Sequence, residues 1–351
     1  MPKAAEAWVE SLSPWPEEFG LEGMRALLGE LGDPQRRYRA IHVVGSKGKS
    51  TAARTIGALL RADGLRTGVY TSPHVSGWAE RIEVEGREGG FERAIGRVRA
   101  AAEAIGATQF EVLTAAAFAE FAAAGVEVAV VEAGLGGRLD ATNIVDAEVA
   151  LLTNVLREHT DVLGETPEEI AAEKLAVAHA ARVVVLPDNS FSHLVPAGAV
   201  TLVGGAREAA EAFVDRPLGP DPEVTLPGRL ELRVGEVRDG AHTPEAVDWL
   251  LAQLPRDSYV ICASVLADKD ADAILERLAA AGTSLVATQS SNPRALAAEA
   301  LAERARAHFE HVETVPDPHA ALARARELAG PDGAVLVTGS LYLLADLHSV
   351  P

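Results

Sequence analysis

Short apolar runs alternate with amphipathic stretches along most of this chain. In the first part, the apolar runs typical of buried strands are residues 40–44, 68–72, 126–134 and 147–155. The helical patterns that separate or follow them are residues 50–63, 91–105, 110–124 and 167–180. Gly64 and Gly125 directly follow two of these helices, as expected of C-terminal caps, and Thr166 with Glu169 forms a capping-box pattern before a third. Continuous apolar strands separated by helices predict a parallel sheet that is covered on both faces.

The pattern weakens over residues 186–228, which are rich in proline, and then resumes. The later strand candidates are residues 258–265, 283–289, 311–315 and 333–338. The later helix candidates are residues 244–254, 269–281, 293–308 and 317–329. A length of 351 residues favours two domains over one. The sequence therefore predicts an α/β domain over residues 1–233 and a second, smaller α/β domain over residues 234–351.

Composition and charge exclude several classes of protein. The formal net charge of −19 disfavours nucleic-acid binding, which needs basic surface to meet phosphate. No run of 18 apolar residues is present, and the N-terminal stretch lacks the basic and apolar regions of a secretory signal, so we expect no membrane association. The single cysteine, Cys262, cannot form an internal disulfide and fits a reducing cytoplasm. We expect a cytoplasmic protein that is a monomer.

The first chemical signal is the glycine- and lysine-rich segment Gly45-Ser46-Lys47-Gly48-Lys49-Ser50-Thr51. It lies between a predicted strand and a predicted helix, so its backbone N–H groups and the helix N-terminus can face an anion. In such a loop the last lysine reaches the outer phosphates and a following hydroxyl binds Mg²⁺. The full eight-residue phosphate-loop pattern is not met, because Val43 stands where its first glycine belongs. The alternative is a glycine-rich turn that carries solvated lysines.

Residues 41–51, IHVVGSKGKST, resemble the phosphate loop of the Mur ligase superfamily in its folylpolyglutamate synthase/dihydrofolate synthase branch. Other segments resemble that branch in the same order: a helix over 24–39, YTSPHV (70–75), FEVLTAAAF (110–118), EAGLGGRLDATN (132–143), TNVLREHTDVLG (153–164), EKLAV (173–177), PGRLE (227–231), DGAHTPEA (239–246), LADKD (266–270) and VTGSLYLL (337–344). The resemblance implies a P-loop parallel-sheet ATP-binding domain followed by a Rossmann-like domain. It also implies an ATP-dependent ligase that adds L-glutamate to folate or dihydropteroate.

Glu132 ends a predicted buried strand and precedes several glycines. A carboxylate at a strand's C-terminal end beside a phosphate loop suits Mg²⁺, although a loop acid without a ligand is the alternative. The resemblance makes Ser72 a further ligand of this metal, together with Ser50 or Thr51. The alternative for Ser72 is a plain turn serine before Pro73.

By resemblance, His159 belongs to a second magnesium site, and Lys174 matches a lysine that the family carbamylates. A carbamate would convert this cation into an anion that can bind metal. The residues alone favour a solvated helix position for Lys174, since lysine is seldom buried. Position 158 is usually aspartate in the family and is Glu158 here.

The remaining site residues come from the resemblance as well. Arg229 and Asp239 match ATP contacts, and His242 and Ser340 match positions near the incoming glutamate. Phe110 matches a contact to the folate. The alternatives are an interdomain salt bridge for Arg229 and Asp239, and a helix N-cap for Ser340.

Three departures from the family pattern concern nucleotide affinity. Lys47 and Thr243 stand where the family has asparagine, and the segment 174–227 is short. That segment lacks a clear counterpart of an asparagine that contacts ATP, and residues 204–213 are the candidate remnant.

The expected mechanism uses ATP as co-substrate and two Mg²⁺ sites. The folate carboxylate attacks the γ-phosphate, the glutamate amine then attacks the acyl phosphate, and Lys49, Lys174, His159 and His242 carry the catalytic roles. A cleft between the domains would close to exclude water. Two alternatives stay open: a sister ligase with another acid acceptor, and a nucleotide-binding homologue that has lost ligase activity.

Overall fold

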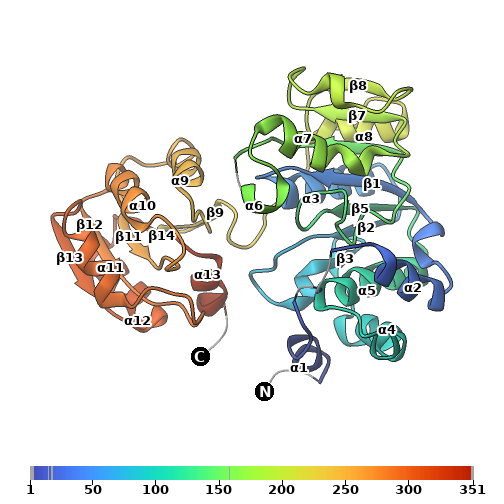
Figure 1. Cartoon of the computed structure of the whole chain (residues 1–351). Coiled ribbons are helices and arrows are strands. Elements are labelled where there is room, and N and C mark those ends of the chain that lie inside the picture. Colours follow the sequence, from blue (N-terminus) through green and yellow to red (C-terminus); the bar gives the residue numbers. More distant parts are fainter. Residues whose placement is uncertain (1–3, 15, 17–18, 158, 349–351) are drawn as a thin grey trace. The chain divides into compact units, whose positions relative to one another are not determined.

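The computed structural model describes residues 4–14, 16, 19–157 and 159–348 (Figure 1). The chain forms two compact units. The first runs from the N-terminal region to His74 and from Trp78 to Val224. The second takes Val75–Gly77 and everything from Thr225 onward. The units therefore separate after Val224, whereas the sequence analysis places the domain boundary after residue 233.

The first unit is built on an eight-stranded sheet with the order β4-β3-β2-β5-β1-β6-β7-β8. Its strands are β1 (Arg39–Val44), β2 (Thr67–Tyr70), β3 (Ile82–Val84), β4 (Arg87–Glu88), β5 (Val128–Glu132), β6 (Val149–Leu152), β7 (Val183–Leu186) and β8 (Val200–Val203). In sheet order, the strands β2, β5, β1, β6, β7 and β8 are parallel to their neighbours. Strands β3 and β4 extend the sheet beyond β2 and are antiparallel. The predicted parallel sheet is confirmed.

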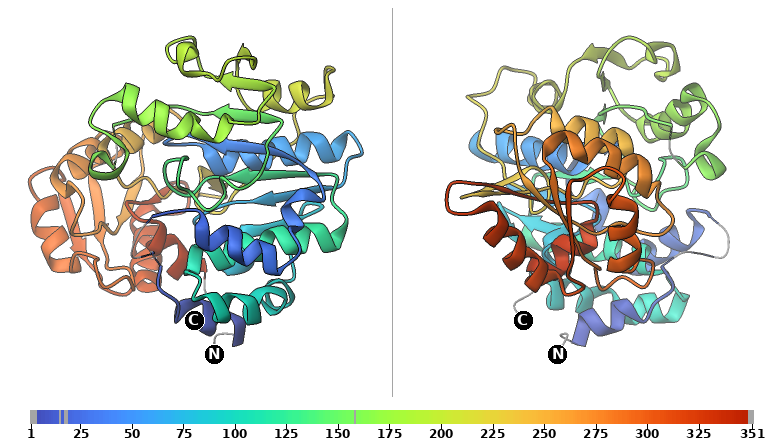
Figure 2. Two further views of the ribbon diagram at one scale, coloured as in Figure 1. Left: turned by 45° about the vertical axis from the view of Figure 1, so that its right-hand side comes forward. Right: turned by 90° about the vertical axis from the view of Figure 1, so that its left-hand side faces the viewer.

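Helices cover both faces of this sheet (Figures 1 and 2). They are α1 (Ala4–Glu10), α2 (Glu22–Glu30), α3 (Lys49–Ala62), α4 (Phe91–Ile105), α5 (Gln109–Ala124), α6 (Thr160–Leu163), α7 (Pro167–Leu175) and α8 (Ala206–Val214). Single 3₁₀ turns are η1 (Pro34–Arg36), η2 (Trp78–Arg81), η3 (Ala176–Ala178) and η4 (Ser192–Leu194).

Strand β1 shows how the sequence builds these layers, because its successive side chains point to opposite faces. Ile41 and Val43 are fully buried in the core that α3 and α8 share with the sheet. Ala40 and Val44 pack on the other face, in clusters that include residues of α5 and of the α7–η3 segment, respectively. Helices on both faces explain why β1 reads as a continuous apolar run instead of an alternating one.

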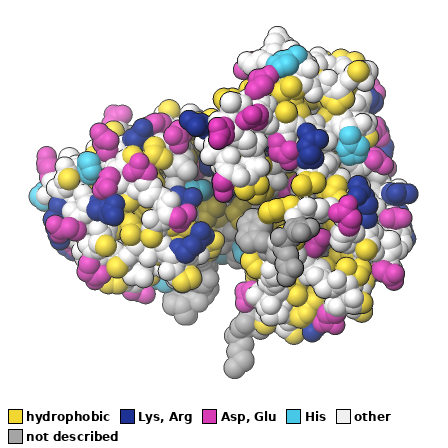
Figure 3. All heavy atoms as spheres, viewed as in Figure 1, with side chains coloured by type: hydrophobic (Ala, Val, Ile, Leu, Met, Phe, Trp, Pro, Cys, Tyr) yellow, Lys and Arg dark blue, Asp and Glu magenta, His cyan; other side chains and the backbone are white. Residues whose placement is uncertain are grey.

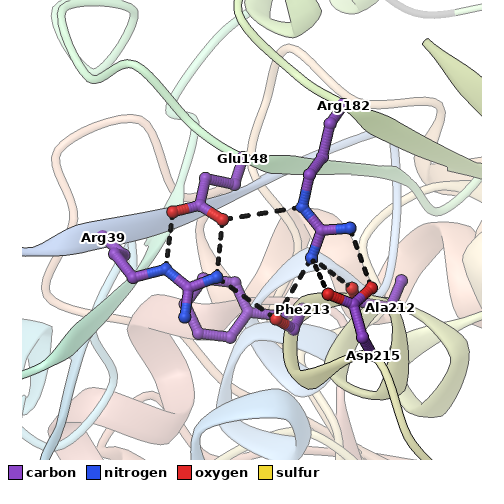
Figure 4. Close-up of polar contacts among 6 residues, drawn as sticks. All are labelled: Arg39, Glu148, Arg182, Ala212, Phe213 and Asp215. Atoms are coloured by element: carbon purple, nitrogen blue, oxygen red, sulfur yellow. Dashed lines mark hydrogen bonds and ion pairs between the residues drawn. The ribbon is translucent and has the colours of Figure 1, made fainter.

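The N-terminal edge of this sheet carries a network of paired charges (Figure 4). Arg39, at the start of β1, donates to both carboxylate oxygens of Glu148 at 2.5 and 2.6 Å. Arg182, just before β7, contacts Glu148 at 3.6 Å and Asp215 at 2.9 Å. Both arginines also donate to the Phe213 carbonyl in the last turn of α8. This edge therefore neutralises its own charges and caps a helix.

The second unit has a six-stranded sheet with the order β13-β12-β11-β14-β10-β9. Its strands are β9 (Glu231–Arg233), β10 (Glu236–Arg238), β11 (Val260–Ala263), β12 (Ser284–Ala287), β13 (His311–Thr314) and β14 (Val335–Thr338). Its helices are α9 (Pro244–Leu251), α10 (Ala271–Leu278), α11 (Ala298–Ala305), α12 (Pro318–Ala329) and α13 (Leu341–His348), with the 3₁₀ turn η5 (Ala279–Ala281) after α10. Only β9 is antiparallel, so the predicted Rossmann-like α/β arrangement is confirmed.

Two sequence predictions need correction. The helix expected over residues 24–39 ends at Glu30, because Gly32 and Asp33 take positive φ and Pro34 follows. The proline-rich stretch 186–228, where the sequence pattern is weak, contains β8 and α8, and α8 begins within the candidate remnant 204–213.

The visible surface carries charges of both signs. On the face shown in Figure 3, basic side chains are scattered among acidic ones, and no continuous basic patch is seen among the residues drawn in colour. Over the described part of the chain, every helix is too short or too polar to cross a membrane.

Candidate active site

The candidate site of the first unit lies at the C-terminal edge of its parallel sheet. The loop after β1 holds Gly45 to Gly48, β5 ends at Glu132, and Ser72 follows β2. Because β1, β2 and β5 are parallel neighbours, these residues share one edge. Crevices at this edge of parallel α/β sheets are the usual place for ligands.

Loop 45–48 has the predicted strand–loop–helix context. Gly45 and Gly48 have φ of 142° and 77°, and Gly48 is the N-cap residue of α3. Lys49 is the first helical residue, so its side chain starts where the helix presents its unpaired N–H groups. A turn of this kind suits an anion, as the sequence predicts.

Two lysines converge on the carbonyl of Gly45. Lys49 Nζ donates to it at 2.9 Å, and Lys174 Nζ, from α7, donates to it at 3.1 Å. Lys174 is only 2% exposed, so the alternative of a solvated helix lysine is wrong. Burying an ammonium group is costly unless it is well paired, which makes its place beside the phosphate loop informative.

Glu132 is 1% exposed and connects two of the predicted metal residues. Its Oε1 accepts a hydrogen bond from Ser50 Oγ at 3.0 Å, and its Oε2 accepts from the Ser72 backbone N–H at 3.0 Å. Ser50 is buried, whereas Thr51 is exposed, so Ser50 is the hydroxyl that shares the site with Glu132. A carboxylate beside a hydroxyl is a hard oxygen set that fits Mg²⁺.

The second predicted metal site is only partly assembled. His159 is exposed, has φ of 50° and precedes α6. Glu158 lies outside the described residues. Lys174 as an ammonium does not fit a cation, so the predicted site would need the carbamate form. Among the described residues, no three His, Cys, Asp or Glu side chains gather as a metal cluster.

Sequence reasoning missed a half-buried arginine at the same edge. The Thr71 backbone N–H donates to the Arg81 carbonyl at 3.0 Å, and Arg81 Nε donates to His74 Nδ1 at 2.9 Å. Burial lowers the pKa of His74 to about 3, with the arginine adding to the shift, so this imidazole is neutral. Burial also lowers the pKa of Arg81, whereas contact with Tyr70 and the charge of Glu132 favour its cationic form.

The glycine loop after Glu132 packs between two predicted site residues. A Cβ at Gly134 would meet the Phe110 ring at 2.5 Å, and one at Gly137 would meet the Lys174 carbonyl at 2.5 Å. Glycine therefore allows both close approaches. The loop connects the metal carboxylate to the predicted folate contact and to α7.

A second hydrogen-bond network, which the sequence did not predict, holds the glycine loop after Glu132. Asp140 Oδ2 accepts from the Gly134 and Leu135 N–H groups at 3.0 and 2.9 Å, and Asp140 Oδ1 accepts from the Thr142 hydroxyl. His42 Nε2 lies 2.9 Å from Thr142 Oγ1. Burial raises the pKa of Asp140 and lowers the pKa of His42 to about 3.

In the second unit the predicted residues gather where β10 and β14 end. Asp239 accepts from the Leu230 and Ala241 N–H groups at 2.7 and 2.8 Å. A Cβ at Gly240 would lie 3.3 Å from Arg229 Nη1. His242 Nδ1 donates to the Gly240 carbonyl at 2.7 Å, which leaves the lone pair of the neutral ring on Nε2.

Ser340 lies beside this group, because the Gly339 N–H donates to the Ala241 carbonyl at 3.0 Å. Its Oγ accepts from the Tyr342 N–H at 3.1 Å, the pattern of a helix cap at the start of α13. Thr243, one of the departures from the family pattern, caps α9 by accepting from the Ala246 N–H.

Comparisons with known proteins identify the family of this chain. Residues 43–198 match the Mur ligase middle domain, and residues 228–341 match the Mur ligase glutamate ligase domain. The dihydrofolate synthase/folylpolyglutamate synthase of Mycobacterium tuberculosis is 32% identical, over 93% of this chain and 89% of the relative. The chain belongs to the folylpolyglutamate synthase/dihydrofolate synthase family. A probable bifunctional folylpolyglutamate synthase/dihydropteroate synthase of Haloferax volcanii is 34% identical, and the chain spans 48% of its length.

Solved structures of the folylpolyglutamate synthase family agree over the whole chain. Folylpolyglutamate synthase of M. tuberculosis, complexed with ADP and AMPPCP, superposes with a TM-score of 0.87 at 31% identity, covering 99% of both chains. Escherichia coli FolC with DHPP and ADP gives 0.85 at 26% identity, covering 99% and 98%. A bifunctional folylpolyglutamate synthase/dihydrofolate synthase with Mn, AMPPNP and L-glutamate bound gives 0.83 at 28% identity, covering 97% and 95%. As a member of this family, the chain is an ATP-dependent ligase that uses a divalent metal.

Proposed function

We propose that this chain joins L-glutamate to the carboxylate of a folate-type acceptor, either dihydropteroate or a folate, through an acyl phosphate made with ATP. The carrying observation is the convergence of Ser50, Glu132, Lys49 and Lys174 around the loop at Gly45. The related enzymes that bind DHPP with ADP, and L-glutamate with AMPPNP, support the choice of substrates.

In the first step, an acceptor carboxylate oxygen forms a bond to the γ-phosphorus while the bond to the β-phosphate oxygen breaks and ADP leaves. Lys49 and the first-turn N–H groups of α3 stabilise the charge on the transferring phosphoryl group. Ser50 and Glu132, with Ser72 nearby, would hold Mg²⁺, whose positive charge would neutralise the phosphate oxygens. Arg229, and Asp239 through the backbone that it orders, contribute to ATP binding.

In the second step, the glutamate amine attacks the acyl carbon and phosphate leaves. The hydrogen bond from Nδ1 to the Gly240 carbonyl orients the His242 ring, which we assign to the ammonium or amine of the incoming amino acid. Ser340 adds a hydroxyl beside it. We assign the acceptor's aromatic part to Phe110, which packs on the glycine loop next to Glu132.

We also propose that Lys174 acts as a carbamate, and that His159 completes a second magnesium site with it. The support is that Lys174 is buried beside the phosphate loop, where a metal-binding anion is more favourable than a second ammonium next to Lys49. The division of roles between residues 1–233 and 234–351, a monomeric state and a cytoplasmic location remain parts of this proposal.

Phosphate release with each acceptor tests the function. Purified chain, ATP, Mg²⁺ and L-glutamate are combined with dihydropteroate, with tetrahydrofolate, or with no acceptor. We expect phosphate and a glutamylated product with at least one of the two acceptors, and only background without acceptor. Nucleotide binding without acceptor-dependent turnover would indicate a homologue that has lost ligase activity, and turnover only with a different acid would indicate a sister ligase.

A further inference from the structure

Residues 153–156, which follow β6, form a brace on the phosphate loop that neither the sequence analysis nor the comparisons assign. Thr153 N–H donates to the Val44 carbonyl at 2.9 Å, which continues the β1–β6 pairing beyond the end of the strands. Further along, the Leu156 N–H donates to Ser46 Oγ at 3.0 Å. The segment therefore contacts both the end of β1 and the loop that follows it.

Asn154 makes the closest set of contacts. Its Oδ1 accepts from the Lys47 N–H at 2.9 Å and from the Ser46 N–H at 3.2 Å, while its Nδ2 donates to the Lys47 carbonyl at 3.1 Å. The Asn154 carbonyl also accepts from the Ser46 N–H at 3.1 Å. A side-chain amide that pairs with both the N–H and the C=O of one residue needs a donor and an acceptor, which aspartate cannot supply.

Thr153 completes the brace through its hydroxyl, which donates to the Lys47 carbonyl at 2.7 Å. The same hydroxyl explains why position 45 is glycine, because a Cβ there would lie 2.0 Å from Thr153 Oγ1. The loop and the segment after β6 are therefore fitted to each other at the backbone level.

These contacts decide which amides of the loop can serve a phosphate. A backbone N–H that already donates to a well-placed oxygen gains little by turning to a ligand. We infer that Asn154 and Thr153 are positioning residues for nucleotide binding, which commit the amides of Ser46 and Lys47 to the brace and leave the triphosphate to Gly48, Lys49 and the first turn of α3. The inference rests on the proposed function, since it concerns the same nucleotide site.

The brace also gives the loop a fixed shape before ATP arrives. A binding site that is ordered in advance avoids the entropic cost of ordering on binding. Lys49 follows directly after the braced loop. The contacts of the brace, which do not touch the substrate, therefore help to position its ammonium group. Loss of the brace should weaken nucleotide binding more than it weakens binding of the acceptor.

The test combines amide hydrogen exchange with nucleotide binding, using the full chain. In the wild type we expect Ser46 and Lys47 amides to exchange slowly with and without MgATP, whereas the amides of Gly48 to Ser50 become protected only with MgATP. Protection of Ser46 and Lys47 that appears only with MgATP would overturn the inference, because those amides would then be phosphate ligands.

Substitutions of Asn154 and Thr153 provide a second test, through the Kd for MgATP. Asn154→Ala should raise the Kd for MgATP about 10-fold, as expected for loss of hydrogen bonds that order the loop. Thr153→Val should raise it about threefold, and Thr153→Ser should restore the wild-type value. Asn292→Ala removes a comparable asparagine-to-backbone contact in the second unit, to the Arg294 N–H at 2.9 Å, and is the control.

The possible outcomes distinguish a failure of the inference about Asn154 and Thr153 from a failure of the proposed function. A folded Asn154→Ala protein that binds MgATP as tightly as wild type would overturn the inference and leave the proposed function intact. A wild-type protein that binds no MgATP would overturn both. If Asn154→Ala does not fold, the Thr153 pair and the wild-type exchange pattern still decide the question.

Discussion

The two edges of the large sheet use charged residues in opposite ways. At the N-terminal edge, Arg39, Glu148, Arg182 and Asp215 pair with each other and with the carbonyls that end α8 (Figure 4). At the C-terminal edge, Lys49 and Lys174 donate to one backbone carbonyl, that of Gly45. The first arrangement neutralises charge within the protein, and the second brings two lysine side chains to the place where a ligand is expected.

The difference follows from the direction of parallel strands. Loops at the C-terminal edge lead into helix N-termini, which favour anions, whereas the opposite edge receives helix C-termini, whose carbonyls favour arginine. Arginine at the N-terminal edge serves α8 in this way. Substitutions at the two edges should therefore separate activity from stability.

The largest effect is expected at Lys49. Lys49→Ala removes the charge that stabilises the transferring phosphoryl group, so kcat should fall by about 10²- to 10³-fold. The melting temperature should change little, because the lost contacts are to loop carbonyls of the same segment. Steady-state phosphate release and thermal unfolding measure the two quantities, and near-normal kcat would contradict the assigned role.

Lys174 should have the next largest effect. Lys174→Ala should lower activity about 10- to 100-fold, the range typical of disturbed metal ligation. Short-chain carboxylates should restore part of the activity by supplying the missing oxygen ligands.

Mass spectrometry of the intact protein in bicarbonate buffer adds a direct observation, since a carbamate adds the mass of CO₂. The carbamate proposal fails if Lys174→Ala keeps full activity without added carboxylate.

Acid sensitivity should trace in part to His42, which lies in β1 between the two edges. Burial, helped by the charge of His179, holds its pKa at about 3 when folded, against 6.5 for the ordinary side chain. The unfolded state therefore binds more protons between those values, and stability falls as the pH falls through this window. From pH 7 to pH 5 we expect His42 to account for about 2 kcal/mol of lost stability.

Urea unfolding of wild type and His42→Gln from pH 7 to pH 5 measures this contribution. The free energy of unfolding of the variant should depend less steeply on pH. Part of the dependence remains, because the folded pKa of His74 is also about 3. Parallel curves for the two proteins would refute the assignment to His42. The Asp140 carboxyl, joined to His42 through Thr142, is the charged group to monitor alongside it.

The smallest effect belongs to the N-terminal edge. Glu148→Gln should cost about 1 kcal/mol of stability, because the pair with Arg39 is well aligned but partly exposed. Its kcat should match wild type, which is the reverse of Lys49→Ala. Asp272→Asn disrupts a more exposed pair with Arg304 and should change the melting temperature less. A large loss of turnover in Glu148→Gln would contradict the assignment of stability to the N-terminal edge and of activity to the C-terminal edge.

Local chemistry made part of this structure predictable. The apolar run before Gly45 and the capping box at Thr166 and Glu169 predict β1 and the start of α7, and the structure has both. The overlong helix over 24–39 ignored a visible stop signal, Gly32 followed by Asp33 and Pro34. The β8 and α8 elements were missed because prolines surround them.

Other features depend on tertiary neighbours that no local pattern specifies. Burial of Lys174 contradicts the usual exposure of lysine and results from α7 packing beside the loop at Gly45. Asn154 lies within a stretch that resembles the family, but its role requires knowing that β6 pairs with β1. Arg81 carries no signal in the sequence, since only the folded chain brings it to His74.

The two glycines that flank the loop after Glu132 differ in what a single added methyl group would displace. At Gly137 the obstacle is the backbone of α7, so alanine there would have to move the helix that carries Lys174. At Gly134 the nearest atoms belong to the Phe110 ring, a side chain that can turn. Position 134 is therefore the natural starting point for engineering acceptor preference, because an added methyl group there meets side chains, the Phe110 ring and Asp140 Oδ2, and not the backbone of α7.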